Sequence, residues 1–520
     1  MANKLLRSEK GKTIAFLTAL NALRIVIQVE LYRLGFVSLA ADEFSRGMRA
    51  AQWSLHPQLN LLLDTRDTWL PLEKYLNGTV LMVWSDVVWA PRLTVFLASA
   101  LLIVSLFLTI RYLFSNFWIA AASVTFISIH PWFVWLSATP MLDVYYLAFF
   151  FTGLYFLVVW LKSARRGYWA IAGVCFLIST GFHVPAWVAI NIVNLLTLGY
   201  FFKDIRQKNY RHLFQLIGFY FIGNLLILLF SAIQYWDTGK VFLFLSKHTE
   251  YSKWYYNGYE VAGWEKLLYY PRLLLENLNP LFWLMVIAGF AFLYRERRQG
   301  VWKWTPLVLT LVVLIFDSFM NYLSVPATAA PGRYSLFYVI GLSPYLGYAV
   351  YQGVSFLRDR PVRWFRGVFA GMLILLFAAN IVLESIRIPR FASEITSDAV
   401  SAGTYLNKLL ADDPSSRYLL ELKYWDFLGV QTTAWHYDNA IYDRIRSEVD
   451  RNTVSIMRQD PDGILSYLKE TNVRYIVLHD DELKSIAKNL PRVRLIKKFG
   501  GWSIYELRRM DTNLNSTDGL

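Results

Sequence analysis

The sequence predicts an α-helical multi-pass membrane protein with about eleven transmembrane helices, followed by a soluble α/β domain. Of its 520 residues, 56% are hydrophobic and only 17% are charged, a balance that argues against a set of ordinary soluble domains. Long apolar stretches recur along residues 1–385. The net charge of +14 does not indicate a nucleic-acid partner, because Lys and Arg lie in short runs between the apolar stretches.

A spanning helix needs about 20 mostly apolar residues, because about 30 Å of hydrocarbon is crossed at 1.5 Å per residue. The first candidate is too long for a signal peptide and contains Arg24, so we interpret it as an uncleaved helix. The pair over 168–202 is predicted to break near His183. The candidate spans are 13–34, 92–113, 117–138, 143–161, 168–182, 184–202, 213–234, 272–293, 304–323, 335–352 and 367–385.

The basic residues predict how the chain is oriented. Cytoplasmic connections carry an excess of Lys and Arg. With the N-terminus inside, this excess falls in the segments predicted to be cytoplasmic, whereas the longer outer connections hold few basic residues. We therefore expect an N-in, C-out topology in the cell membrane, either a plasma or an inner membrane. The basic cytoplasmic segments are 1–12, 111–116, 162–167, 203–212, 294–303 and 357–366.

Two regions are not predicted to span. Residues 35–91 form an outer loop whose Trp-rich middle suits helices lying in the membrane interface. Residues 386–510 form a mixed α/β domain, and 511–520 a disordered tail. Residues 1–385 then form the transmembrane domain. In the α/β domain we expect strands over 417–422, 473–480 and, on either side of Gly500-Gly501, 494–507, with a helix over 460–472.

This topology gathers polar side chains on the outer face, and each also has a plain structural interpretation. A pair of adjacent acids can form a solvated cap at the end of a helix, and an acid three residues after a proline can cap the start of a helix. A His beside a Pro can form a hydrogen bond with backbone groups that the proline leaves without a partner. Neighbouring residues point in different directions, so one acid of the first pair is expected to do the chemistry. The candidates are Asp42, Glu43, Arg46, His56, Lys74, Asp143, His183, Arg333 and Tyr334.

Two further residues limit the possibilities. Arg24 stands eleven residues into the first span, too deep to reach water by snorkelling alone, so it should face a partner or cavity. Cys175 is the one cysteine. The chain therefore has no internal disulfide and no cysteine-based metal site.

The order of motifs resembles a known family. A basic N-terminus, a first helix with an internal Arg, "DE" at its outer end, "WLPLEKYLNG" and "WAPRLTVFLASALLIVSLFLTIRYLF" follow one another. "HPWFVWLSATPMLDVYY" and "GRYSLFYVIGLSP" come later. Over about residues 10–385 the chain resembles the GT-C glycosyltransferases of the protein O-mannosyltransferase and aminoarabinose-transferase type, which are family 39-like.

The resemblance implies transfer of a sugar from a polyprenyl-phosphate donor to a lipid, protein or glycan acceptor on the extracytoplasmic side. The acid of the first outer loop carries over to Asp42, with Glu43 beside it, and the second acid to Asp143. His183 stands where the family often has a Lys. Either His56 or Lys74 matches a further family position.

The chemistry of these residues suits that reaction. Asp42 would take the acceptor proton while attack at the anomeric carbon expels the lipid phosphate with inversion. Arg333, with Lys74, Arg46 or His183, would hold the phosphate. The metal requirement stays open, since the acids could also bind Mg²⁺ or Mn²⁺. The alternatives are a secondary transporter, which would place its polar sites near mid-membrane in two related halves, and a lipid-linked glycan polymerase or ligase.

Overall fold

The computed structural model describes residues 8–59, 69–163, 167–206, 210–241, 263–296, 301–323, 332–358, 364–423, 425–435, 437–444 and 455–508. The chain divides into two compact units. We call them the helical unit, Met1–Leu34, Pro57–Leu76 and Arg92–Phe391, and the sheet unit, Gly35–His56, Asn77–Pro91 and Ala392–Leu520. The predicted disordered tail, 511–520, lies outside the described residues.

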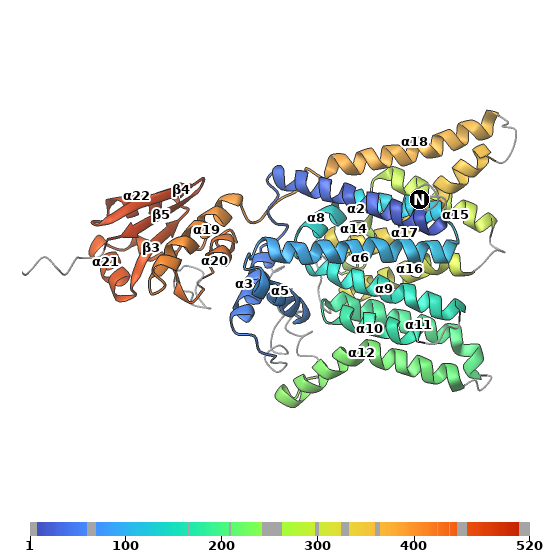
Figure 1. Cartoon of the computed structure of the whole chain (residues 1–520), viewed down its shortest axis with the longest axis horizontal. Helices are drawn as coiled ribbons and strands as arrows, with labels where there is room; N and C mark the ends of the chain where they lie inside the picture. The colour runs from blue at the N-terminus through green and yellow to red at the C-terminus, as the bar shows by residue number, and fades with distance from the viewer. Residues whose placement is uncertain are drawn as a thin grey trace, which may run out of the picture. The chain divides into compact units, whose positions relative to one another are not determined.

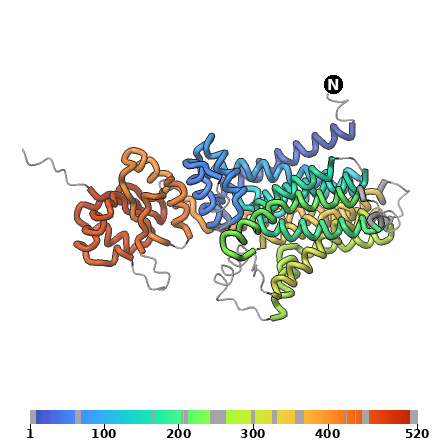
Figure 2. Tube along the Cα trace, turned by 90° about the horizontal axis from the view of Figure 1, so that it is seen from below, coloured from blue at the N-terminus to red at the C-terminus, as the bar shows by residue number. Residues whose placement is uncertain are grey.

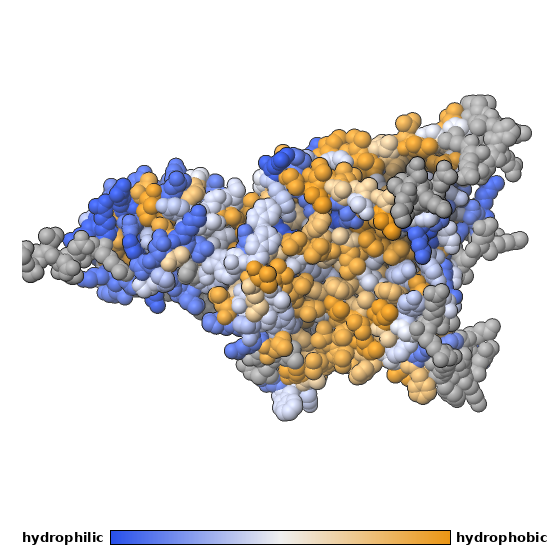
Figure 3. All heavy atoms as spheres, in the orientation of Figure 1, coloured by the Kyte–Doolittle hydropathy of each residue, from blue (hydrophilic) through white to orange (hydrophobic). Residues whose placement is uncertain are grey.

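The helical unit is a bundle whose long helices run side by side in both ribbon views (Figures 1 and 2). Its surface is largely apolar along these helices (Figure 3), as expected for a membrane-spanning bundle. Two helices, α5 (Leu72–Val83) and α6 (Trp89–Phe114), carry residues of both units. The other helices are α2 (Glu9–Arg33), α7 (Phe117–Ile129), α8 (Pro131–Ala138), α9 (Leu142–Ser163), α10 (Tyr168–Thr180), α11 (Val184–Arg206), α12 (Tyr210–Thr238), α14 (Glu265–Asn277), α15 (Pro280–Arg295), α16 (Thr305–Tyr322), α17 (Ser335–Arg358) and α18 (Trp364–Arg387).

Each predicted span coincides with helix, but two are broken where a single helix was expected. The span predicted over 117–138 bends by 65° between α7 and α8, and that over 272–293 bends by 103° between α14 and α15. Both breaks precede a proline, Pro131 and Pro280, which lacks an N–H and disfavours helical geometry in the residue before it. The predicted break near His183 is confirmed, since α10 ends at Thr180 and α11 begins at Val184.

The number of spans is lower by a strict test of length and apolarity. Within the described residues seven helices pass, or nine if each bent pair is one span. Helix α10, with 13 residues, is too short to pass alone. A multi-pass helical membrane protein with a small C-terminal sheet is therefore confirmed, whereas the count of eleven stays a prediction.

Arg24 is buried, as expected, and contacts neighbouring helices instead of water. Its guanidinium donates hydrogen bonds to the Ser99 hydroxyl on α6 and to Asn21 Oδ1 at 2.7 Å. It also lies over the Phe133 ring, 4.9 Å from the centroid. One turn later, Gln28 donates to the carbonyl of Ser137 at 2.8 Å. These bonds fasten α2 to α6 and α8 where lipid offers no alternative partner.

The sheet unit is built on five strands in the order β2-β1-β3-β5-β4. The predicted strands and the helix α21, which Asp460 caps by accepting from the Gly463 amide at 3.2 Å, are confirmed. The first three strands are parallel, while β5 runs antiparallel to β3 and β4. The elements are α3 (Asp42–Leu55), α19 (Ser397–Asp412), β1 (Arg417–Leu420), α20 (Phe427–Ala434), β2 (Ala440–Tyr442), α21 (Pro461–Glu470), β3 (Val473–Leu478), α22 (Asp481–Asn489), β4 (Val493–Phe499) and β5 (Trp502–Leu507).

Helices cover both faces of this sheet, because its central strands are apolar on both sides. Leu419, Ile476 and Tyr505 pack with α21 and α22, while Tyr418 and Trp502 pack with α19 and α20. The core between the sheet and helices α19 and α20 also includes residues from far earlier in the sequence, namely Val37, Ala41 and Phe44. The segment around "DE" is therefore part of the sheet unit.

The start of α3 is held by two carboxylates. Glu43, 3% exposed, accepts from the amides of Leu39 at 2.7 Å and Ala40 at 3.3 Å. Glu394 accepts from the amide of Ala41 at 2.8 Å. These backbone donors have no partner within the helix, so the carboxylates satisfy them. Glu43 is thus committed to its own backbone, whereas Asp42 is partly exposed.

We expect Ser99→Ala to destabilise the protein, because it removes an acceptor from a buried cation, at a cost of about 1–3 kcal/mol. Arg24→Met in the same background should recover most of the loss, since the cation is then gone and the space stays filled. Thermal unfolding in detergent measures both. An unchanged melting temperature for Ser99→Ala would show that Arg24 does not depend on this bond.

We expect Glu43→Ala to lower stability by about 1 kcal/mol, because two amides at the start of α3 lose their acceptor. Asp42→Asn should lower stability less, since its side chain is partly exposed and the Asn oxygen can still accept from Arg46. Both variants are compared by thermal unfolding of the full chain. Equal losses would contradict the division of roles between these two acids.

Candidate functional site

The helical unit holds an ion pair made of two predicted site residues, one buried and one partly buried. Asp143 lies in the first turn of α9 and is 1% exposed. Its Oδ2 lies 3.7 Å from Nε of Arg333. This distance exceeds hydrogen-bond length, and Oδ2 has no hydrogen bond among the described residues. A buried carboxylate oxygen without a donor is costly, so it can accept a hydrogen bond from a ligand.

The backbone next to Arg333 packs closely against side chains of two other helices. Arg333 belongs to a short 3-10 helix, η3 (Gly332–Tyr334). A Cβ on Gly332 would lie 2.4 Å from the Trp132 ring and 2.8 Å from Asn277 Oδ1. Trp132 Nε1 donates to that same oxygen at 2.5 Å. Only glycine fits there, which fixes the backbone that presents Arg333.

Aromatic rings connect the ion pair to His183. The guanidinium of Arg333 lies over the Tyr334 ring, 5.4 Å from its centroid. That ring stacks on His183 at 5.8 Å with an interplanar angle of 6°. The His183 ring also lies 5.4 Å from the ring of Tyr146, one turn after Asp143 on α9. The structure thus brings Asp143, His183, Arg333 and Tyr334 together.

Lys74 lies on a helix that begins beside the His183 turn. The Leu72 amide at the start of α5 donates to the Gly181 carbonyl at 3.3 Å. Lys74 follows in the first turn of this helix and lies over the Tyr75 ring at 4.8 Å. The half-buried Lys74 therefore belongs to the same end of the helical unit as His183.

The remaining predicted residues lie in the sheet unit, on α3. Asp42 and Arg46 form an ion pair at 3.5 Å, with the Arg46 side chain 4% exposed and that of Asp42 38% exposed. Glu43 holds the helix start, as described above. His56 follows the last helical residue and is exposed.

Sequence analysis missed three residues of the helical-unit cluster. Tyr146 follows Asp143 by three residues on α9, and its ring lies 5.4 Å from the His183 ring. Asp317 accepts a hydrogen bond from Tyr338 at 2.6 Å. An acid inside a predicted span, 304–323, was a signal that could have found Asp317. The spacing of three from Asp143 puts Tyr146 on the same helix face, which could have found that ring.

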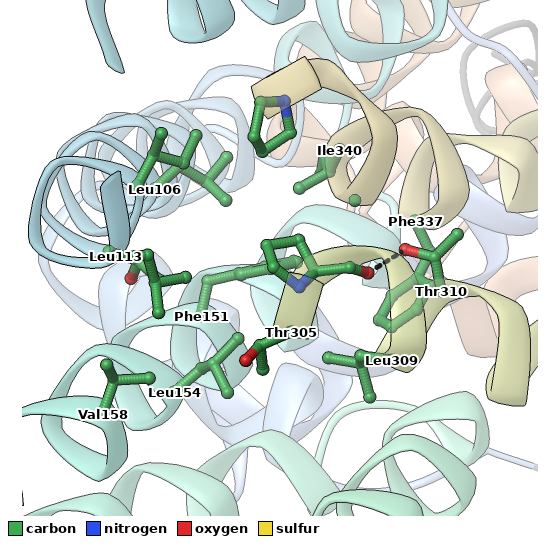
Figure 4. A pocket seen from close by; sticks show the side chains of 15 residues that line it. Leu106, Leu113, Phe151, Leu154, Val158, Thr305, Leu309, Thr310, Phe337 and Ile340 are labelled. Carbon is green, nitrogen blue, oxygen red and sulfur yellow. Dashed lines mark hydrogen bonds between the residues drawn. The ribbon is translucent and has the colours of Figure 1, made fainter. Parts of the chain in front are cut away.

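The helical unit also contains a small apolar cavity that lies apart from these charges. It measures about 30 Å³ and is lined by side chains of α6, α9, α16 and α17 (Figure 4). One of its hydroxyls, that of Thr310, donates to the Pro306 carbonyl at 2.7 Å. Its lining includes no ionisable residue, so we place the site at the Asp143–Arg333 pair instead.

A metal centre made by the chain alone is not evident. Across the described ranges, no three His, Cys, Asp or Glu side chains gather closely enough to hold an ion. The prediction of Mg²⁺ or Mn²⁺ rested on two separate acids, Asp42 and Asp143, and it stays a prediction.

No protein-family model and no curated protein matches this sequence. Solved structures do match over nearly the whole chain. An aminoarabinose-transferase structure, ArnT of Cupriavidus metallidurans bound to undecaprenyl phosphate, aligns with a TM-score of 0.58 and 10% identity, covering 97% of this chain and 99% of that one.

Oligosaccharyltransferases align as well. The Archaeoglobus fulgidus enzyme in the apo form matches with a TM-score of 0.54 and 10% identity, over 98% of this chain and 76% of that one. Archaeal AglB from the same organism, in complex with an inhibitory peptide and a dolichol phosphate, aligns with a TM-score of 0.51 and 12% identity. This alignment covers 96% of this chain and 75% of that one. The two-unit chain with its broken apolar helices therefore has the GT-C fold, the fold of these membrane glycosyltransferases.

Proposed function

We propose that this protein is a glycosyltransferase that moves a sugar from a polyprenyl phosphate to an acceptor outside the membrane. The observation that carries the proposal is the Asp143–Arg333 pair, largely buried in a helical unit of GT-C fold. Similar folds were solved with undecaprenyl phosphate and with dolichol phosphate. Both ligands combine an apolar chain with one phosphate.

Arg333 is the proposed phosphate contact. Its guanidinium is planar, permanently charged and suited to bidentate bonds with phosphate oxygens. Its side chain is 13% exposed, and its Nε lies 3.7 Å from Asp143 Oδ2, a distance longer than a hydrogen bond. The oxygens of a donor phosphate would add acceptors for this guanidinium. The His183 and Tyr334 rings beside Arg333 would border this phosphate, and Lys74 would add charge from α5.

The proposed reaction is a single displacement. The acceptor hydroxyl oxygen attacks the anomeric carbon, the bond from that carbon to the phosphate oxygen breaks, and its electron pair leaves with the lipid phosphate. Asp42 takes the hydroxyl proton, which makes it the general base. Attack opposite the leaving group inverts the configuration. Arg333 stabilises the phosphate as its negative charge grows.

Asp42 is the better base of the adjacent pair. Its side chain is partly exposed and has one cationic neighbour, Arg46, whereas the Glu43 carboxylate is occupied by backbone amides. His56 is exposed and stays a secondary candidate.

The acceptor and the metal requirement are separate parts of the proposal. A lipid, protein or glycan hydroxyl or amine would each satisfy the displacement chemistry. Carboxylates such as Asp42 and Asp143 are ligands that Mg²⁺ and Mn²⁺ use. Transfer measured before and after EDTA treatment decides whether an ion takes part.

We expect the N-terminus inside and the sheet unit outside, because the basic connections mark the cytoplasmic side. Single cysteines placed at Lys408 and at Arg295 in a Cys175→Ala background test this orientation. A membrane-impermeant maleimide should label the first in intact cells and the second only after lysis. The reverse pattern would place the proposed active site in the cytoplasm.

We expect Asp42→Asn to lower kcat about 10²–10⁴-fold, because it removes the proton acceptor but keeps an oxygen that can accept from Arg46. Arg333→Ala should lower kcat/KM by about 10²–10³-fold through lost phosphate contacts. Transfer is followed as loss of radiolabel from a panel of undecaprenyl-phosphate sugars.

The matched control for this assay is Glu30→Gln, an acid on α2 whose exposed side chain pairs with Arg33. It should transfer normally. Normal transfer by Asp42→Asn would overturn the assignment of the base. No transfer by the unchanged protein across the donor panel would overturn the proposed function.

A further inference from the structure

The helical unit contains a second acid that the proposed mechanism does not use. Asp317 lies in α16, five residues before its last residue, Tyr322, in a helix apolar and long enough to span. A carboxylate inside such a helix is costly. Residues of this kind mark substrate pathways or binding sites more often than lipid-facing surface. Asp317 therefore calls for a functional explanation.

Asp317 is held in place by one aromatic partner. Tyr338 on α17 is 1% exposed and donates its hydroxyl to Asp317 Oδ2 at 2.6 Å. The Tyr338 ring packs edge-on against Tyr270 of α14 at 6.3 Å. Three helices thus fix the orientation of the carboxylate. A carboxylate has room for about four hydrogen bonds, and the described part of the chain gives Asp317 this single one.

Tyr338 links Asp317 to the proposed phosphate site. Helix α17 continues directly from η3, so Tyr338 follows Tyr334 by four residues, about one helical turn. The Asp317 carboxylate bonded to Tyr338 therefore lies in the neighbourhood of Tyr334 and Arg333. Arg333, the proposed phosphate contact, pairs with Asp143.

We infer that Asp317, oriented by Tyr338, binds hydroxyl groups of the transferred sugar and so selects the donor. This inference rests on the proposed function. The sugar is bonded directly to the phosphate, so its hydroxyl groups lie within a few ångströms of a phosphate that is bound at Arg333. A carboxylate in mostly apolar surroundings that accepts from a hydroxyl forms a strong, charge-assisted hydrogen bond. A site of this kind also rejects an analogue that lacks the hydroxyl.

The aromatic surroundings fit the same ligand. Tyr146, Tyr270 and Tyr338 are each at most 5% exposed, and together with the acid they provide flat apolar faces beside a polar group. Binding sites for small molecules combine such walls with few, precisely placed polar atoms. A purely structural bond between α16 and α17 is the competing explanation, and it would affect stability without distinguishing ligands.

The test is ligand binding to the purified full-length protein, with undecaprenyl phosphate and undecaprenyl-phosphate sugars as the probes. Asp317→Asn keeps the size and an acceptor for Tyr338 but loses the charge. It should weaken binding of the sugar-bearing lipid by about tenfold to a hundredfold, because hydrogen bonds to charged groups are lost. Binding of undecaprenyl phosphate alone should stay within about twofold. Arg333→Ala should weaken both ligands.

Thr310→Ala is the matched control, because Thr310 is a polar residue of the same helix that bonds its own backbone. It should leave both affinities unchanged. Tyr338→Phe should weaken the sugar-bearing lipid selectively, because the carboxylate is then less well oriented.

The outcomes separate the two hypotheses. If Asp317→Asn weakens both ligands equally, or neither, the sugar-binding role is wrong while the proposed function stands. If the unchanged protein binds sugar-bearing lipids no more tightly than undecaprenyl phosphate, the sugar-binding role is wrong as well. If it binds none of the lipids, the proposed function is wrong and this inference fails with it.

Discussion

The packing of Val37, Ala41 and Phe44 into the core of the sheet unit is the constraint on which the position of Asp42 depends. Thr432 on α20 adds a hydrogen bond to the Phe44 carbonyl at 3.0 Å, and Glu394 holds the Ala41 amide. An acid on a free loop would sample many positions. Here Asp42 is the first residue of a helix that is packed, capped and hydrogen-bonded to its surroundings. Such a position suits a general base, which must be held within reach of the proton that it accepts.

The helical unit meets a different requirement, that of keeping charges largely away from the water that would solvate them. Asp143 is buried beside the partly buried Arg333, and the rings of Tyr146, His183 and Tyr334 lie next to this pair. In such surroundings each electrostatic contact is stronger than in water. The same surroundings make any unmatched polar atom expensive, so the pair is suited to a ligand that supplies both a negative group and hydrogen-bond donors.

Much of the fold could be predicted from local pattern, because apolar length and strand alternation are recorded in short windows of sequence. The strands flanking Gly500-Gly501 and the helix after Asp460 are examples. The bends before Pro131 and Pro280 were missed, since a long apolar stretch was given more weight than one proline. Asp317 was missed for a related reason, because its partner Tyr338 is distant in sequence. The assignment of residues 35–56 to the sheet unit depends on tertiary packing that no window contains.

That assignment has a consequence for biosynthesis. Phe44 emerges from the ribosome early, but Ile395, Leu428 and Trp502, which share its core, are made last. The segment around Asp42 therefore stays without its packing partners while the intervening helices are made and inserted. Completion of the sheet unit is thus a post-insertion step, and a chain that terminates before residue 395 would carry Asp42 without the packing that positions it.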